Sequence, residues 1–293
     1  MSYKGIVLAG GSGQRLSPLT KILNKHLLPI HDKPMIFYAL SILFLSKIKD
    51  ILVICRKQDI KSFQNLLGDG TRFGVNFEYA VQEKPTGITE AFVIGENFIN
   101  NSNVALVLGD NFFYGHQLTE KLLKAKSKNK SCTIFTYPVK NPSAYGVAEM
   151  LDTKKIKSIK EKPKKTLSNL AITGFYLFDN KVSKIAKKIK PSKRNETEIT
   201  SLLNIYLKEK KLKVENIGRG STWFDAGTFD DLEKASMLVK NIEERQGLKI
   251  ACLEEISLIN KWITKKEIKN SIKFYGACSY SIYLNKIISN ENY

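Results

Sequence analysis

Residues 5–16 read GIVLAGGSGQRL, a short apolar run that passes directly into a glycine-rich loop. The glycines let backbone N–H groups approach an anion closely, and the guanidinium of Arg15 adds a planar donor for phosphate oxygens. The spacing matches neither GxxxxGKS/T nor GxGxxG, and a tight turn after a strand explains such a loop equally well. Lys25 lies ten residues beyond Arg15 and can fold back onto the same phosphates, which favours a phosphate-binding loop.

On the C-terminal side of this loop, helical patterns alternate with short apolar runs that are typical of buried strands. The helical patterns occupy residues 34–47, 59–67 and 87–94, and the apolar runs occupy residues 51–55, 77–81 and 104–108. Such alternation indicates βαβ units. The fold class is therefore expected to be α/β, with a Rossmann-like, mixed but mostly parallel sheet flanked by helices.

The middle of the chain is richer in strand patterns, which fall at residues 132–139, 147–150, 156–160 and 172–178. We therefore expect antiparallel strands to join the sheet there. Helical patterns return at 181–188 and 199–208, followed by a strand at 213–217 and a long helix from residue 228 to about 245.

After Gly247 only small amphipathic segments follow, at residues 253–263 and 265–272. Segments of this size cannot form a core alone. We predict one main domain over residues 1–247 and a helical C-terminal segment over residues 248–293, packed on that domain or on a neighbouring subunit.

The composition is that of a globular protein with a sizeable core, since 43% of the 293 residues are hydrophobic. No apolar run reaches the ~20 residues of a membrane span, and residues 35–45 are interpreted as a buried helix. The N-terminus lacks signal-peptide features, so we expect a cytoplasmic protein without membrane contact. The four cysteines form no CxxC pair and the three histidines lack HExxH spacing, which argues against zinc and redox sites.

The formal net charge of +19 raises the hypothesis of a nucleic-acid partner. The lysines, however, are spread along the whole chain and fall mainly on expected helix faces and turns, as in residues 121–126 and 187–190. We interpret them as solvated surface charge that favours solubility, and we expect no nucleic-acid partner.

Two aspartates stand where a metal site could form. Asp110 follows the strand-like run 104–108, and open α/β sheets place their ligands at strand C-termini. Asp225 lies in a Trp-Phe-Asp-Ala-Gly turn just before the long helix. Mg²⁺ commonly takes one or two carboxylates with phosphate oxygens and water, so the pair suits magnesium. A strand-end turn at Asp110 and a helix cap at Asp225 are the simpler explanations of each residue alone.

Three further segments carry polar groups at strand ends. Gln82 has an amide that can both donate and accept, which matches the O4 acceptor and N3–H donor of thymine or uracil. Tyr145-Gly146 suits a close backbone approach to a sugar ring. Glu161-Lys162-Pro163 follows a strand, and the proline keeps the lysine at an edge by preventing a helix. Out of context, an exposed surface position is the simpler explanation of the Glu161-Lys162-Pro163 tripeptide, and an exposed strand end is the alternative for Gln82.

Together these segments resemble the sugar nucleotidylyltransferases and, among them, the glucose-1-phosphate thymidylyltransferases. The resemblance begins with GGSGQRLSPLT at residues 10–20 and NKHLLPIHDKPMIFYAL at residues 24–40, and it extends over nearly the whole chain. It also includes QD at 58–59, LGDG at 67–70, LGDN at 108–111, YGV at 145–147, EKP at 161–163, WFDAGT at 223–228 and EERQG at 243–247. Each motif is weak alone, but their common order and spacing are specific.

The resemblance implies transfer of a thymidylyl group from dTTP to glucose 1-phosphate, with Mg²⁺ as cofactor and pyrophosphate as the second product. It implies a nucleotide-diphospho-sugar transferase fold, a catalytic domain over residues 1–247, a homotetramer and a place in dTDP-rhamnose synthesis. The implied catalytic residues are Arg15, Lys25 and Lys162, and the implied metal ligands are Asp110 and Asp225. The implied nucleotide-binding residues are Leu8, Gly10, Gly11, Ser12, Gly13, Gln14, Arg15, Lys25, Gln82 and Gly87. The implied sugar-phosphate site consists of Asp110, Tyr145, Gly146, Glu161, Lys162 and Ile172.

Several positions depart from the family pattern. Gln14 replaces a threonine and His26 replaces a glutamine, both on the predicted triphosphate loop. In the C-terminal part, where the family has an inhibitory site, Ile259 replaces an arginine. The alternatives are uridylyl transfer from UTP, because a thymine methyl offers only about 1–3 kcal/mol of discrimination, and a non-catalytic nucleotide-binding regulatory homologue.

Overall fold

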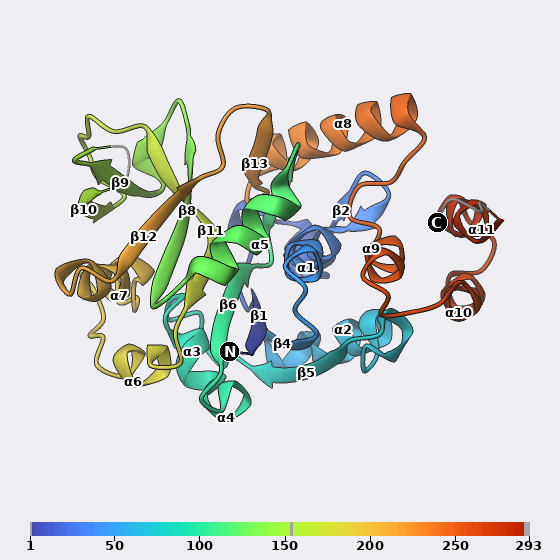
Figure 1. Ribbon diagram of the computed structural model, residues 1–293, viewed down its shortest axis with the longest axis horizontal. Coiled ribbons are helices and arrows are strands. Elements are labelled where there is room, and N and C mark those ends of the chain that lie inside the picture. Colours follow the sequence, from blue (N-terminus) through green and yellow to red (C-terminus); the bar gives the residue numbers. More distant parts are fainter. Residues whose placement is uncertain (1, 153–154, 290–293) are drawn as a thin grey trace.

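A nine-stranded sheet forms the centre of the protein, which a computed structural model describes for residues 2–152 and 155–289 (Figure 1). The described residues leave out residues 1 and 153–154 of the predicted main domain and residues 290–293 of the predicted C-terminal segment. The strands of this sheet are β1 (Tyr3–Ala9), β4 (Asp50–Cys55), β5 (Asn76–Val81), β6 (Asn103–Leu108), β8 (Cys132–Pro138), β9 (Gly146–Met150), β10 (Ile156–Glu161), β11 (Leu170–Phe178) and β12 (Leu212–Asn216).

The first half of the sheet is parallel, as the alternating pattern predicted. β1 lies between β6 and β4, and β5 follows at the edge, all in parallel register. Strands covered on both faces need apolar side chains on both faces, which explains the continuous apolar runs. Ile6 belongs to the hydrophobic cluster on one face and Val7 to the cluster on the other.

The second half of the sheet contains the expected antiparallel strands. β11 runs antiparallel to β6, β8 and β9, and β12 lies parallel to β8. The pairing of β11 with β8 shifts register between Ile172 and Tyr176. Such irregularities often re-aim groups beside a functional site.

The helices pack on the faces and at one end of this sheet (Figure 1). They are α1 (Met35–Leu45), α2 (Ile60–Leu67), α3 (Glu90–Ile94), α4 (Glu96–Ile99), α5 (Leu118–Lys128), α6 (Val182–Ala186), α7 (Ile199–Lys208), α8 (Phe229–Gln246), α9 (Leu253–Ile259), α10 (Lys265–Tyr275) and α11 (Ser279–Ser289). Helix α1 is buried at every position from Met35 to Phe44, which confirms its interpretation as a core helix. Among the described residues, none of the helices combines the length and the apolar character that crossing a bilayer requires.

A second, two-stranded sheet was not predicted. Its strands, β7 (Asn111–Gly115) and β13 (Ser221–Asp225), pair antiparallel. The sequence interpretation that placed Asp225 in a turn was therefore wrong, because Asp225 is the last residue of a strand. The two strands are distant in the sequence, so no local pattern announces their pairing. A short hairpin of β2 (Pro29–Ile30) and β3 (Lys33–Pro34) completes the strands.

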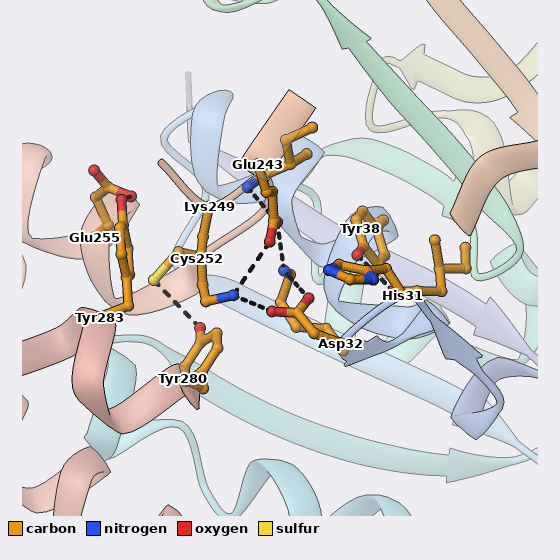
Figure 2. A network of polar contacts seen from close by, with 12 residues as sticks. His31, Asp32, Tyr38, Glu243, Lys249, Cys252, Glu255, Tyr280 and Tyr283 are labelled. Atoms are coloured by element: carbon orange, nitrogen blue, oxygen red, sulfur yellow. Dashed lines mark hydrogen bonds and ion pairs between the residues drawn. The ribbon is translucent and has the colours of Figure 1, made fainter. Parts of the chain in front are cut away.

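A buried ionic network ties this hairpin to the C-terminal helices (Figure 2). Lys33 is 2% exposed and donates to Asp32 and to Glu243 of α8, the latter at 2.9 Å. Lys249 donates to the same two carboxylates, at 3.1 Å to Glu243. The ring of Tyr280 in α11 lies 5.9 Å from the Lys249 ammonium. The network thus joins three segments that are far apart in the chain.

Removing one cation from this network should destabilise the fold. Replacing Lys33 by alanine leaves the buried carboxylate of Glu243 and the partly buried carboxylate of Asp32 with one lysine, and we expect the free energy of unfolding to fall by about 3 kcal/mol. The matched control is Lys240→Ala, which removes an exposed pair with Glu244 and should change it by less than about 1 kcal/mol. Urea denaturation measures both, and equal losses would contradict a stabilising role for the buried network.

Candidate functional site

One large cavity opens at the carboxyl ends of the parallel strands, beside the glycine-rich loop. Its volume is about 990 Å³, which is large enough for a nucleotide together with a sugar. Most of the predicted site residues line it: Leu8, Gly11, Arg15, Lys25, Gln82, Gly87, Asp110, Tyr145, Gly146, Glu161, Lys162, Ile172 and Asp225. The fold therefore collects side chains from both halves of the chain into one site.

Four described residues of the predicted loop lie outside the cavity lining: Gly10, Ser12, Gly13 and Gln14. A Cβ atom at Gly10 would collide with Gln82 Oε1, so the glycine permits the loop to pack on that side chain. Gly13 has a φ of 64° and starts a 3-10 turn, a conformation that favours glycine. Ser12 and Gln14 are exposed. Their role as nucleotide contacts stays a prediction.

The two predicted cations of the loop reach toward the predicted metal ligands. Lys25 packs its side chain on Gly11, where a Cβ atom would lie 3.3 Å from Lys25 Cε, and its ammonium donates to Asp110 Oδ2. Arg15 reaches the segment after β13, because a Cβ atom at Gly227 would lie 2.7 Å from the Arg15 guanidinium. Both positive groups therefore stand beside the two aspartates.

Asp110 and Asp225 are brought together by the pairing of β7 with β13. Asp225 is in register with Asn111, and the N–H of Ala226 donates to the carbonyl of Asp110 at 2.9 Å. Burial opposes ionisation of Asp110, but the ammonium of Lys25 holds its pKa well below the usual range. Burial, together with the charge of Asp110, raises the pKa of Asp225 to about 6.

This carboxylate pair fits a hard divalent cation. Two oxygen-bearing side chains that repel each other in one cavity offer the donor set that Mg²⁺ prefers, and phosphate oxygens can complete it. The described residues contain another group with ligand spacing, His31, Asp32 and Glu243. Lys33 and Lys249 already donate to both of its carboxylates (Figure 2), so we assign that group to the ionic network.

His26, which departs from the family pattern, is buried beside Asp110. Its Nδ1 lies 2.7 Å from the Oδ1 of Asn24, whose amide nitrogen donates to Asp59. A carbonyl oxygen only accepts, so Nδ1 carries the proton. Burial and the neighbouring Lys25 charge lower the pKa of His26 to about 3. The imidazole is therefore neutral and adds no charge to the site.

Gln82 is held at one end of the cavity by a residue that the sequence analysis missed. Its Nε2 donates to Glu90 Oε2 at 2.8 Å, and a carboxylate oxygen can only accept. The contact therefore identifies the amide atom that faces Glu90 as the nitrogen. Gly87 lies nearby with a φ of 130°, and a Cβ atom there would be 2.5 Å from the carbonyl oxygen of Thr197. Only glycine fits that close approach.

The predicted sugar-phosphate residues form another part of the cavity lining. Lys162 has a φ of 38°, an uncommon conformation that is typical of functional sites, and its N–H donates to the Tyr145 carbonyl at 3.0 Å. The Tyr145 hydroxyl donates to Asp225 Oδ1 at 3.0 Å. Burial, together with the charge of Glu198, raises the pKa of Glu161.

Arg194 is a further cavity residue that the sequence analysis missed. Its guanidinium lies 3.5 Å from Glu161, 3.1 Å from Glu196 and 3.5 Å from Glu198. In the sequence it stands in KPSKRNETE, a run that is typical of solvated charge. Only the fold places this arginine beside the predicted sugar site.

Comparisons with known proteins identify the family of the chain. The model of the nucleotidyl transferase family matches residues 4–242. A glucose-1-phosphate thymidylyltransferase of Neisseria gonorrhoeae is 47% identical over 97% of this chain and 99% of its own, and one of Mycolicibacterium smegmatis is 46% identical over 98% and 100%.

Solved structures show the same fold. A Bacillus anthracis protein assigned as a glucose-1-phosphate thymidylyltransferase aligns with a TM-score of 0.75 and 40% identity over 81% of this chain and 95% of its own. A UDP-glucose pyrophosphorylase in complex with UDP-glucose aligns with a TM-score of 0.72 and 26% identity, over 83% of this chain and all of its own.

The raised pKa of Asp225 predicts a pH-dependent stability in metal-free protein. Because the folded state holds this proton up to about pH 6 and the unfolded chain releases it near its ordinary value of 3.8, folding stability from this residue falls as pH rises between them. Asp225→Asn should therefore be more stable than the unaltered protein at pH 7.5, by roughly 2–3 kcal/mol. In EDTA, urea denaturation should show this difference closing toward pH 4; a pH-independent difference would contradict the assignment.

Proposed function

The chain belongs to the nucleotidyl transferase family, and on that premise we propose that it transfers the thymidylyl group of dTTP to glucose 1-phosphate, giving dTDP-glucose and pyrophosphate. The observation that carries this proposal is the convergence of three kinds of group in one cavity. A base-reading amide, Gln82, lies at one end, the Asp110 and Asp225 pair lies beside the loop cations, and Lys162 lines the sugar end.

Recognition of the base falls to Gln82 and Gly87. Glu90 takes one N–H of the Gln82 amide and so fixes its orientation, and the other N–H and the carbonyl oxygen would serve as donor and acceptor to the base. That donor and acceptor match O4 and N3–H of thymine and mismatch the pattern of cytosine. A site that reads the base by hydrogen bonds rejects an inverted pattern strongly.

Lys25 and Arg15 would bind the β- and γ-phosphates of dTTP and would steady the departing pyrophosphate. Asp110 and Asp225 would hold Mg²⁺, whose charge would offset that of the phosphate oxygens around the α-phosphorus. Lys25 must exchange its contact with Asp110 for one with phosphate when the nucleotide arrives. On this proposal the ammonium of Lys25 would pair with phosphate, and Asp110 would pair with Mg²⁺. Neither charge would then be left buried without a partner.

At the sugar end, Lys162 would hold the phosphate of glucose 1-phosphate, while Glu161 and the backbone of Gly146 and Ile172 contact the sugar hydroxyls. Arg194 adds a second cation beside Glu161. The N–H groups of its planar guanidinium can donate to the Glu161 carboxylate or to a phosphate oxygen.

The chemical step we propose is a direct in-line displacement. A phosphate oxygen of glucose 1-phosphate attacks the α-phosphorus of dTTP, and the bond from that phosphorus to the oxygen bridging the β-phosphate breaks. Because the nucleophile arrives as an anion, no base is required to activate it. The cavity contributes by aligning the two anions and offsetting their repulsion.

Several finer points belong to the same proposal. We propose that the enzyme acts in the cytoplasm, that it supplies the dTDP-rhamnose pathway and that it assembles as a homotetramer. Residues 248–293 would contribute to subunit contacts beyond a catalytic domain of residues 1–247. Helices α9 to α11 lie on the side of the molecule away from β9 and β10 (Figure 1), which leaves the sugar end of the cavity clear of them.

A nucleotide panel tests the proposed reaction. We expect pyrophosphate release with glucose 1-phosphate, Mg²⁺ and dTTP, weaker release with UTP, and none with CTP, ATP or GTP. Lys162→Ala should lower kcat/KM for glucose 1-phosphate by roughly 100-fold, because it removes a charge-assisted phosphate contact. Lys160→Ala removes an exposed lysine of β10, two residues before Lys162, that pairs with Glu149, and it serves as the matched control.

The outcome with UTP decides between the two pyrimidine candidates. The fold similarity to a UDP-glucose pyrophosphorylase makes uridylyl transfer the second candidate. Faster turnover with UTP than with dTTP would favour that candidate, and silence with every nucleotide and several sugar phosphates would overturn the proposed enzyme.

A further inference from the structure

Asn111 is a buried polar residue of the cavity that the mechanism above does not use. It is the first residue of β7, is 2% exposed and stands directly after Asp110. Its Oδ1 accepts two hydrogen bonds, from the indole N–H of Trp223 at 2.6 Å and from the backbone N–H of Gly174 at 2.9 Å. Its Nδ2 donates to Asp110 Oδ1 at 2.9 Å.

These contacts leave only one orientation for the amide group of Asn111. The indole and backbone nitrogens can only donate, so the atom facing both must be the oxygen. The NH₂ group is then forced toward Asp110. A side-chain amide whose orientation is set by two fixed donors is a rigid hydrogen-bond donor to the carboxylate.

The surrounding backbone is adapted to this arrangement. Gly174 lies within the register shift of β11, where its N–H donates to Asn111 and not along the sheet. A Cβ atom at Gly174 would lie 2.5 Å from Oδ1 of Asn111. Trp223 and Asp225 lie two residues apart on β13 and so share the face on which Asn111 pairs with Asp225.

We propose that Asn111 is the positioning residue for Asp110 in the proposed reaction, on which this inference rests. Asn111 occupies Oδ1 of Asp110 and fixes the rotation of its carboxylate. The second oxygen, Oδ2, is left to face a cation, and the ammonium of Lys25 donates to it. A carboxylate fixed in this way binds Mg²⁺ without first losing rotational freedom, since partners behind a metal ligand orient it.

The proposal predicts a selective loss of the magnesium-dependent part of nucleotide binding. The test measures the dissociation constant of dTTP by calorimetry, in EDTA and in saturating Mg²⁺, for the full chain and for Asn111→Ala. In EDTA the two values should agree within about twofold, because Asn111 donates to Asp110 and not to the phosphates. In Mg²⁺ the variant should bind dTTP on the order of tenfold more weakly.

Further variants separate positioning from general structural damage. Trp223→Phe keeps an aromatic ring but removes one of the two donors that orient Asn111. It should therefore also weaken dTTP binding in Mg²⁺ relative to binding in EDTA, by a smaller factor than Asn111→Ala. It also keeps the test available if Asn111→Ala does not fold. Asn204→Ala is the matched control, since Asn204 donates only to the backbone carbonyls of Ile159 and Thr200.

The outcomes separate this inference from the proposed function. If Mg²⁺ increased the affinity for dTTP by the same factor in the unaltered protein and in Asn111→Ala, the inference alone would be overturned. The same holds if Asn111→Ala weakened dTTP binding equally with and without Mg²⁺. If dTTP binding by the unaltered protein does not respond to Mg²⁺, the metal assignment itself fails and the inference fails with it.

Discussion

The site depends on the pairing of two short strands, β7 and β13. This pairing sets Asp225 opposite Asn111 and ties the backbone of Ala226 to Asp110, so two carboxylates share one cavity. Two such groups repel each other unless cations or protons compensate. Here the ammonium of Lys25 compensates Asp110, and the raised pKa of Asp225 reflects the remaining repulsion and its burial. The same unbalanced negative charge suits a divalent cation, which in the proposed reaction would also hold phosphate oxygens at the site.

Much of the fold could be predicted from the sequence because its signals are local. The apolar runs of β1, β4 and β6 and the buried helix α1 each carry their own pattern, and all were confirmed. The pairing of β7 with β13 could not be predicted in this way, because each strand is five residues long and its partner is remote. The interpretation of Asp225 as a turn residue failed for that reason.

The same difference between local patterns and contacts of distant segments applies to the candidate site. Residues within short motifs, such as Lys162 and Gln82, could be found because their neighbours resemble a known family, and the cavity brings them together. Arg194, Glu90 and Asn111 were missed because their significance lies in contacts with distant residues. Arg194 sits in a charged run that is typical of solvent-exposed surface. Asn111 entered the sequence analysis only as the last residue of the LGDN motif, and its contacts with Gly174 and Trp223 come from distant segments.

In the proposed reaction the cavity aligns two phosphate groups for direct displacement and forms no covalent bond to either. The stereochemistry at the α-phosphorus distinguishes this direct displacement from a two-step reaction. The reaction is run with one diastereomer of dTTP that carries sulfur on the α-phosphorus, and the configuration of the thio-substituted dTDP-glucose is determined by phosphorus NMR. A single in-line displacement predicts inversion. Retention would require two displacements through a nucleotidyl-enzyme intermediate and would contradict the account.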